Sequence, residues 1–229
     1  LVRSLMNMGM PKPITGDFLA IQDEYLQEER DMRGITESEK LPSISGNPRI
    51  ALWQGDITTL KADAIVNAAN SGMLGCFHPL HSCIDNIIGT MSGIQLRLYC
   101  HDMMRKQGHE EPTGQAKITP AFNLPSKYIL HTVGPIIRGA VRKQDRAALA
   151  SCYRSCLELA GRARACQCGL LLHLHRGVPL PQPGGRPAGG GRRDGVPPAN
   201  HFHSEGDLQC IQGCRRSHLP RPPGTGSQR

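Results

Sequence analysis

Three residues in a short Gly-containing segment have the types and the spacing of a metal site. Cys76, His81 and Cys83 follow the pattern C-x4-H-x-C. Two thiolates and one imidazole suit Zn²⁺, and three protein ligands leave a fourth position open, as a catalytic zinc ion requires in order to bind water or a hydroxyl. His78 is a spare candidate whose i+2 spacing from Cys76 fits less well. From the spacing alone, unligated loop thiols are the alternative.

Polar side chains also follow two expected strands. Asp56 comes just after residues 49–53, and Asn67 and Asn70 end a strand expected at residues 62–67. Ligands of α/β proteins bind at the carboxyl ends of strands, where a carboxylate can accept a hydrogen bond and Asn offers both a donor and an acceptor. The alternatives are an Asp that caps a helix and an Asn that tolerates a left-handed turn.

Alternating strands and helices must position these residues. Runs of apolar residues predict strands at residues 49–53, 62–67, 116–121 and 128–133. Helical periodicity marks residues 17–33, 84–106 and 144–160, whereas residues 1–16 have the pattern of an irregular lead-in and residues 35–48 that of a polar linker. This alternation favours an α/β layered domain with a mainly parallel sheet.

Several motifs together resemble the macrodomain, the ADP-ribose-binding fold. They are GDIT from Gly55, IVNAAN from Ile65, TGQA from Thr113 and HTVGP from His131. The segment GCFHPLHSCIDN, which begins at Gly75, resembles more closely the zinc-containing macrodomains of microbial protein-ADP-ribose hydrolases. The similarity covers about residues 1–160. It implies a three-layer α/β/α macrodomain with a central mixed sheet that is incomplete after about residue 161.

The resemblance also implies a role for individual residues. Zn²⁺ would be held by Cys76, His81 and Cys83. ADP-ribose would be bound by Asp56 and Ile57 at the adenine and by Asn67, Asn70 and Gly75 elsewhere. Catalysis would rest on Asn70 and Asp85.

Asp85 would position or activate the attacking water near the distal ribose. The alternative is that Asp85 has only a structural role, because an acidic residue in the first turn of a helix is stabilised by the helix dipole. Gly89 departs from the family's pattern, because relatives usually have His at that place, and this departure is expected to disturb packing behind the site.

The net charge of +8 is carried almost entirely by the last part of the chain. Residues 162–229 hold ten Arg, no Lys and three acidic residues, which gives +7, together with nine Pro and twelve Gly. By composition this is a disordered basic tail. Because the rest of the chain is nearly neutral, the pI near 9.2 is not taken as evidence for a nucleic-acid partner.

A reading-frame shift explains this tail. Codons for residues 171–185 can be chosen so that, when they are read one nucleotide later, they encode CCISTGVFRFPNQEA. Codons for residues 161–171 and 199–223 can likewise be chosen so that the same shifted frame encodes segments with the pattern of a folded domain. The Cys and His pairs of the tail, for which a second zinc site is the alternative, are then codon by-products. The family's second phosphate loop, ISTGVF in the shifted frame, is replaced by HLHRGV in the written protein.

These observations divide the chain into three parts and set its class. Residues 1–47 are an N-terminal helical extension, residues 48–161 are the N-terminal two-thirds of a macrodomain, and residues 162–229 are the aberrant tail. No run of 18 or more apolar residues is present, so no membrane partner is expected. The start lacks a signal peptide and an initiator Met, which predicts a cytoplasmic location and a fragment. Nine Cys favour reduced thiols or metal ligands.

The predicted function is zinc-dependent removal of ADP-ribose from modified protein side chains, impaired in this chain. One alternative is a reader module that binds ADP-ribose without cleaving it. The other is a non-functional product of the frameshifted gene. The sequence leaves the target protein, the linkage and the oligomeric state open.

Overall fold

The structure is a computed structural model that describes residues 2–137, 139–171 and 209–213. Five α-helices are described in this part of the chain: α1 (Val2–Met8), α2 (Gly16–Arg33), α3 (Ile84–Ser92), α4 (Ile94–Gln107) and α5 (Lys143–Arg162). Two short 3₁₀ turns cover Ser38–Lys40 and Ile57–Thr59. Among the described helices, none combines the length and the apolar character needed to cross a membrane.

A seven-stranded mixed sheet forms the centre of the molecule. Its strands run in the order β2-β3-β9-β8-β5-β7-β6. Their bounds are β2 (Ser43–Ile44), β3 (Asn47–Gln54), β5 (Ala64–Ala69), β6 (Ala116–Pro120), β7 (Tyr128–Val133), β8 (Cys168–Leu171) and β9 (Gln209–Gly213). Strand β5 pairs in parallel with both β7 and β8, whereas the other four pairs of this sheet are antiparallel. The expectation of a mainly parallel sheet is therefore wrong, because β2, β3, β9 and β8 pair with one another in antiparallel fashion. A separate two-stranded pair joins β1 (Thr36–Glu37) to β4 (Leu60–Lys61).

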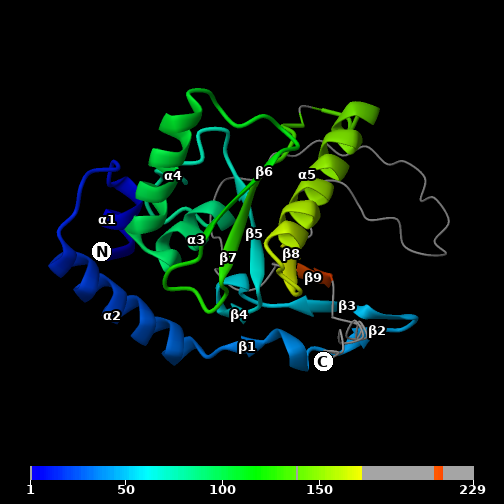
Figure 1. Cartoon of the computed structure of the whole chain (residues 1–229), viewed down its shortest axis with the longest axis horizontal. Helices are drawn as coiled ribbons and strands as arrows, with labels where there is room; N and C mark the ends of the chain where they lie inside the picture. Colours follow the sequence, from blue (N-terminus) through cyan, green and yellow to red (C-terminus); the bar gives the residue numbers. More distant parts are fainter. Residues whose placement is uncertain (1, 138, 172–208, 214–229) are drawn as a thin grey trace, which may run out of the picture.

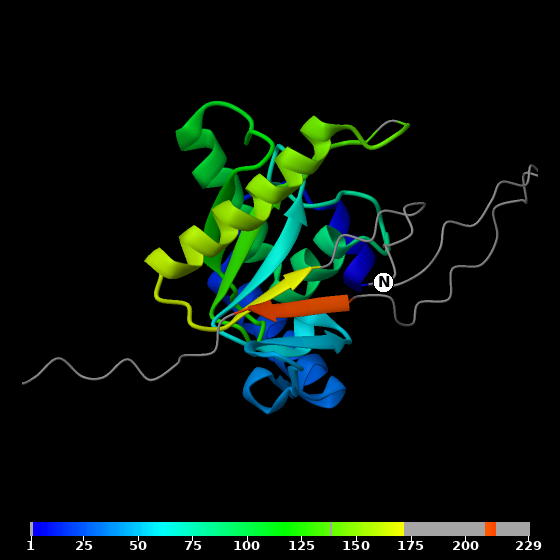
Figure 2. The ribbon, with the colours of Figure 1, turned by 90° about the vertical axis from the view of Figure 1, so that its right-hand side faces the viewer.

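Helices cover both faces of the sheet, so the molecule has three layers (Figures 1 and 2). Because successive strand residues point to opposite faces, Ile65 of β5 packs with Ile88 and Leu96 of α3 and α4, whereas Val66 packs with Cys156 of α5. This alternation yields two apolar clusters, one on each side of the sheet. The expected three-layer α/β/α arrangement with a mixed sheet is thereby confirmed.

One helix of the sequence prediction is wrong in its extent. Residues 84–106 were expected to form one helix, but α3 and α4 are separated at Gly93, whose φ is +100°. A side chain at this position would collide with the side chains of Gln95, Gln22 and Asn123. Apolar periodicity continues through the break, and only the positive φ of the glycine ends the first helix.

Two segments expected to be irregular contain regular structure. Helix α1 lies within residues 1–16, where an irregular lead-in was expected. After residue 161, where no regular structure was expected, β8 and β9 pair with each other and join the sheet between β5 and β3 (Figure 2). The frameshift interpretation mainly concerns residues 172–208 and 214–229, which lie outside the described residues. It stays a prediction, as do the domain boundaries.

Candidate functional site

The polar residues predicted from the sequence gather at the carboxyl end of β5. Asn67 lies near the end of β5, with its side chain buried, and Asn70 follows in the turn after the strand. Helix α3 begins at Ile84 and packs on β5, so that Asp85 in its first turn reaches both amides. The strand end and the helix start therefore bring together three residues separated by up to 18 positions in the sequence.

Asp85 accepts hydrogen bonds from both asparagines. The amide Nδ2 of Asn67 lies 2.8 Å from Asp85 Oδ1, and the amide Nδ2 of Asn70 lies 3.1 Å from Asp85 Oδ2. Burial raises the pKa of the Asp85 carboxyl above its usual value, although the two amide bonds act in the opposite direction. A buried carboxyl with an elevated pKa, held at a sheet edge, has the character of a proton acceptor for an attacking water.

A buried histidine fixes the orientation of Asn67. The Nδ1 atom of His131 on β7 lies 3.1 Å from Asn67 Nδ2, and its Nε2 atom lies 2.9 Å from Thr119 Oγ1 on β6. Burial lowers the pKa of His131 to about 4, so the ring is neutral at pH 7. Because the amide of Asn67 can only donate to Nδ1, the proton of the neutral ring is assigned to Nε2, which donates to Thr119.

The three predicted metal ligands converge in the loop before α3. The ligand atoms of Cys76, His81 and Cys83 all lie within 4.8 Å of one another, and they are the one such group of three in the described residues. The Sγ atom of Cys76 lies 3.5 Å from His81 Nδ1. Zinc bonds of about 2.3 Å to sulfur and about 2.1 Å to nitrogen place tetrahedral S and N ligands about 3.6 Å apart, so this pair fits the ion.

The chemistry of the donor set also fits a divalent cation. Cys83 is the N-cap of α3, and burial together with the neighbouring Cys76 raises its pKa to about 11, although the backbone N–H of Asn86 bonds to it. A metal ion supplies the positive charge that converts such thiols into thiolates. His78 is exposed, and its ring packs edge-on against His81 at 5.9 Å. That the cluster binds zinc stays a prediction.

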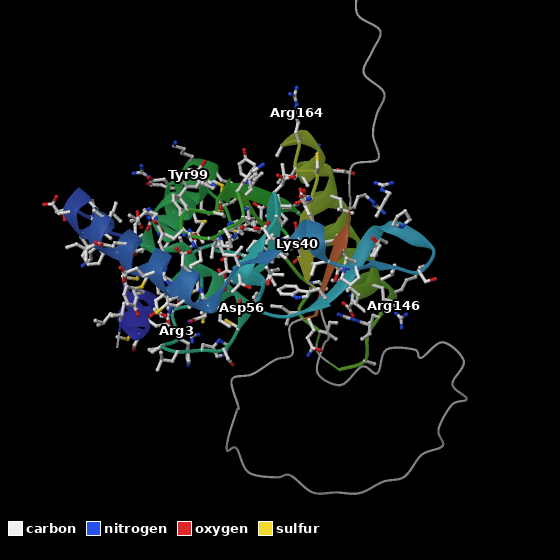
Figure 3. The ribbon with its side chains drawn as sticks, turned by 90° about the horizontal axis from the view of Figure 1, so that it is seen from below. Arg3, Lys40, Asp56, Tyr99, Arg146 and Arg164 are labelled. Carbon is white, nitrogen blue, oxygen red and sulfur yellow. The ribbon has the colours of Figure 1, made fainter. Side chains whose placement is uncertain are left out.

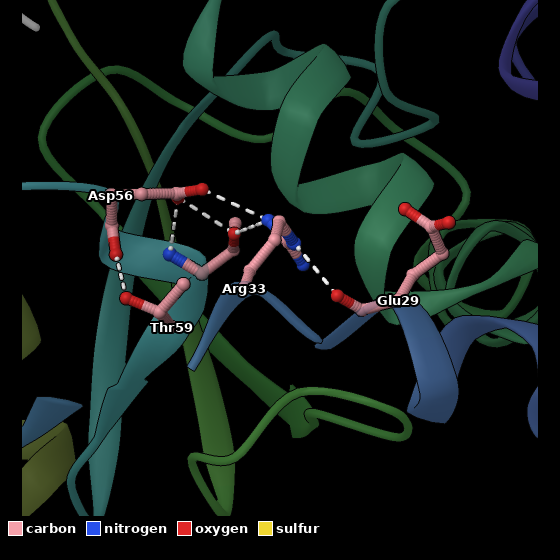
Figure 4. Close-up of polar contacts among 5 residues, drawn as sticks. Glu29, Arg33, Asp56 and Thr59 are labelled. Carbon is pink, nitrogen blue, oxygen red and sulfur yellow. Dashed lines mark hydrogen bonds and ion pairs between the residues drawn. The ribbon is translucent and has the colours of Figure 1, made fainter. Parts of the chain in front are cut away.

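Asp56 is the residue that the sequence predicts to bind the adenine of ADP-ribose. Its Oδ1 atom accepts from the Thr58 backbone N–H at 2.9 Å and from the Thr58 hydroxyl at 2.6 Å, as a cap of the 3₁₀ turn Ile57–Thr59 (Figure 4). Its Oδ2 atom accepts from Arg33 Nη1 at 2.9 Å. The capping alternative is therefore observed, and Oδ2 keeps a second lone pair for a ligand.

Ile57 is wholly buried in the apolar cluster under α3 and α4. Neither its side chain nor its main chain is therefore exposed to a ligand in this structure, and the predicted contact of Ile57 with adenine stays a prediction. Gly75 has a φ of +78°, and its carbonyl oxygen accepts from Asn70 Nδ2 at 3.0 Å. Asn70 thus links Asp85 to the start of the metal loop, which comprises residues 75–83.

Comparison with known proteins places this arrangement in a family. Residues 66–168 match the Macro domain family. A protein-ADP-ribose hydrolase of Treponema medium is 59% identical over 162 residues, which are 70% of this chain and 62% of that protein. The chain contains a macrodomain. A protein-ADP-ribose hydrolase of Staphylococcus aureus (strain MSSA476) is 51% identical over 161 residues, which are 70% of this chain and 60% of that protein.

Solved macrodomains share the fold. The Trypanosoma brucei macrodomain in complex with ADP has a TM-score of 0.51 and 27% sequence identity, and the match covers 73% of this chain and 71% of that one. This chain spans 60–62% of the length of the two hydrolases named above.

In this macrodomain a small cavity lies behind Asp85. Its volume is about 20 Å³, and Asn67, Asp85, Gly89 and His131 are among the residues that line it. A side chain at Gly89 would meet no atom within 4 Å. The Oδ1 atom of Asn67 is buried without a hydrogen-bond partner in the described part of the chain, and the cavity is large enough for one water molecule. Gly89, which stands where the family's pattern has His, therefore borders the cavity behind Asp85.

Several residues around the macrodomain's site were not singled out from the sequence. Asn86 is buried and donates through Nδ2 to the His78 carbonyl oxygen at 2.8 Å, which fixes the metal loop. Arg97 of α4 lies 4.4 Å from the ring centroid of Phe77. Asn86 lies inside the family motif, but Arg97 is one polar residue among many on its helix, and only the fold reveals its contacts.

Proposed function

We propose that this macrodomain is a protein-ADP-ribose hydrolase whose reaction depends on a zinc ion held by Cys76, His81 and Cys83. The identity to proteins of that name supports the reaction class, and the convergence of the three ligand atoms beside Asp85 carries the metal proposal. Zinc in such a site supplies Lewis-acid polarisation of a substrate oxygen.

The chain's own residues divide the substrate between two positions. At one of them, the Oδ2 atom of Asp56 accepts a hydrogen bond from the adenine amine. At the other end the amides of Asn67 and Asn70 hold Asp85 Oδ1 and Oδ2 in place. Asp85, whose burial raises its pKa, takes the proton of the attacking water near the distal ribose.

A reader module that binds ADP-ribose without cleavage is the second candidate. The Trypanosoma brucei relative was solved in complex with ADP, which is consistent with nucleotide binding at this fold. A reader has no use for two cysteines and a histidine that converge within 4.8 Å beside a buried carboxyl. This convergence is the observation that favours hydrolysis.

We also propose that hydrolysis by this chain is slower than that by the two hydrolases named above. The motif ISTGVF of the second phosphate loop is replaced by HLHRGV at residues 173–178, so that Arg176 stands at the place of the motif's glycine and the pyrophosphate loses the family's cradle sequence. A non-functional product of a frameshifted gene is the limiting case. A cytoplasmic location and the lack of nucleic-acid or membrane partners stay predictions.

The test is release of ADP-ribose from a mono-ADP-ribosylated protein, followed by mass spectrometry. The wild-type chain should release it, more slowly than the Treponema medium hydrolase. A chelator or Cys83→Ser should stop release while calorimetry still detects ADP-ribose binding. Cys166→Ser, at a half-buried cysteine outside the cluster, is the matched control and should release normally. Binding with no release by the wild type would favour the reader, and neither activity would favour the non-functional product.

A further inference from the structure

Helix α1, which lies outside the expected macrodomain core, contacts the metal loop directly. Asn7 of α1 is buried, and its Oδ1 atom accepts a hydrogen bond of 3.1 Å from the backbone N–H of Leu80. Its Nδ2 atom donates to Thr90 Oγ1 on α3 at 2.9 Å. One side chain of α1 therefore ties the loop to the helix that carries Asp85.

A second residue of α1 contacts the loop beside its histidine ligand. The Nη2 atom of Arg3 donates to the His81 carbonyl oxygen at 2.9 Å and to Asn86 Oδ1 at 3.2 Å. Asn86 in turn donates to the His78 carbonyl oxygen. Figure 3 labels Arg3 on α1. Within the metal loop, Arg3 thus contacts His81 and Asn7 contacts Leu80, two and three positions before Cys83.

Arg97 joins the end of α1 to the beginning of the same loop. Its Nη1 atom donates to the carbonyl oxygens of Met6, Asn7 and Gly9, and its Nη2 atom lies 3.5 Å from the Cys76 carbonyl oxygen. The last carbonyls of a helix have no partner within the helix, so a guanidinium that binds two of them, and the carbonyl of Gly9 just after the helix, holds the helix end firmly. The loop is therefore held at both ends by α1 and its anchor.

The loop has little else to keep its shape. Most of its residues between Cys76 and Cys83 are exposed, so apolar burial contributes little. Leu80 has a φ of +57°, a left-handed conformation that is strained for a residue other than Gly and therefore has a cost. An external hydrogen bond to the N–H of this residue offsets that cost, and Asn7 supplies it.

We propose that α1 positions the metal loop, with Arg3 and Asn7 as positioning residues for Cys76, His81 and Cys83. This inference rests on the proposed function, because the loop is a metal loop only if the cluster binds zinc. Partners that orient metal ligands from outside the coordination sphere commonly change metal affinity by about 10–100-fold. The N-terminal extension is then a working part of the site rather than an appendage to the domain.

The experiment measures zinc affinity by competition with a chromophoric chelator, together with the visible spectrum of the Co²⁺-loaded protein. The variants are Arg3→Met, which removes the donors but keeps the apolar stem, and Asn7→Ala. We expect each to weaken zinc binding about tenfold or more and to weaken or shift the tetrahedral Co²⁺ bands. Arg3→Lys, which keeps a donor, should recover most of the affinity.

Two controls separate positioning from general destabilisation. Arg105→Met makes the same chemical change at an exposed arginine of α4, and Leu5→Ala truncates an exposed side chain of α1 itself. Both should bind zinc like the wild type. If Arg3→Met lowers the thermal midpoint of the metal-free protein but leaves zinc affinity and the Co²⁺ spectrum unchanged, α1 is only structural and the proposal fails.

Failure of the proposed function gives a different pattern. In that case the wild type itself binds no zinc, and Cys83→Ser changes nothing. Hydrogen exchange of the metal-free protein then still tests the positioning contact: the Leu80 amide should exchange faster in Asn7→Ala than in Leu5→Ala. Equal exchange in these two variants would overturn the contact as well.

Discussion

Asn67 donates its side-chain amide to Asp85 at 2.8 Å, and this bond joins the end of β5 to the first turn of α3. The amide cannot turn over, because the same nitrogen faces His131 Nδ1 at 3.1 Å. The carboxylate is thus held by a residue that is itself held by a neutral histidine and, behind it, by Thr119. The orientation of the candidate base is set by strands β5, β7 and β6 together.

The first prediction tests Asp85 as the proton acceptor. Asp85→Asn keeps the size and one acceptor toward Asn67 but removes the basic carboxylate. We expect release of ADP-ribose to fall by about 10²–10⁴-fold, the usual contribution of general base catalysis, while ADP-ribose binding persists. Single-turnover release assays and calorimetry measure the two effects. Asp102→Asn, at an exposed acid of α4, is the control. Unchanged release by Asp85→Asn would assign the proton transfer elsewhere.

The second prediction separates the two roles of Asp56. Ser is as good a helix cap as Asp, so Asp56→Ser should leave the free energy of unfolding within about 0.5 kcal/mol of the wild type. Its hydroxyl cannot replace Oδ2, and losing a hydrogen bond to a charged group should weaken ADP-ribose binding about tenfold.

An ADP-ribose analogue with hypoxanthine in place of adenine lacks the exocyclic amine and provides the specificity check for Asp56. The wild type should bind this analogue more weakly than ADP-ribose, and Asp56→Ser should bind both alike. Arg33→Met removes the ion pair with Asp56 together with the hydrogen bonds from Arg33 to Thr58 Oγ1 and to the Glu29 carbonyl oxygen. The ion pair is partly exposed, so its loss should matter little for stability. If Asp56→Ser still prefers adenine, the role of Asp56 is capping only.

Much of the sheet could be predicted from the sequence, because buried strands are short apolar runs. Strand β7 has the expected range 128–133, and β6 ends one residue earlier than expected. The spacing of Cys76, His81 and Cys83 also indicated their convergence, since the loop between them is short. Both predictions depend on local pattern alone.

The support around the site could not be predicted, because it depends on contacts between distant parts of the chain. Arg97 meets α1 across 90–91 positions, and Arg3 meets His81 across 78. Helix α1 has seven residues, too few for a convincing period, and it is held by tertiary contacts. The break at Gly93 is likewise invisible to periodicity, because apolar residues continue on both sides.

The third prediction concerns Gly89, which lies in the middle of α3 next to the cavity behind Asp85. A Cβ there would meet nothing within 4 Å, and Gly destabilises a helix interior by about 0.5–1 kcal/mol relative to Ala. Gly89→Ala should therefore raise the free energy of unfolding by that amount in urea titrations. Gly93→Ala, at a φ of +100°, should lower it. Destabilisation by Gly89→Ala would mean that the space behind Asp85 is required.

The last prediction follows from His131. Burial lowers its pKa from 6.5 to about 4, so between these values the unfolded chain binds a proton that the folded chain does not. The stability that His131 contributes is complete above pH 6.5 and is lost as the pH falls toward 4, by about 3 kcal/mol in all. Asp85 is linked to the ring through Asn67, and Lys117 is the partner residue of His131 on β6.

Urea titrations of the metal-free protein between pH 7 and pH 4.5 measure this dependence without proton release from metal ligands. The wild type should lose stability steadily below pH 6.5, whereas His131→Gln, which carries no titrating ring, should show a flatter profile even if its stability at pH 7 is lower. The slope therefore reports the buried neutral ring rather than the cost of the substitution. Equal slopes in the two proteins would mean that His131 takes up its proton in the folded state as readily as in the unfolded chain, and the hydrogen-bonded order Thr119–His131–Asn67–Asp85 would have to be reassigned.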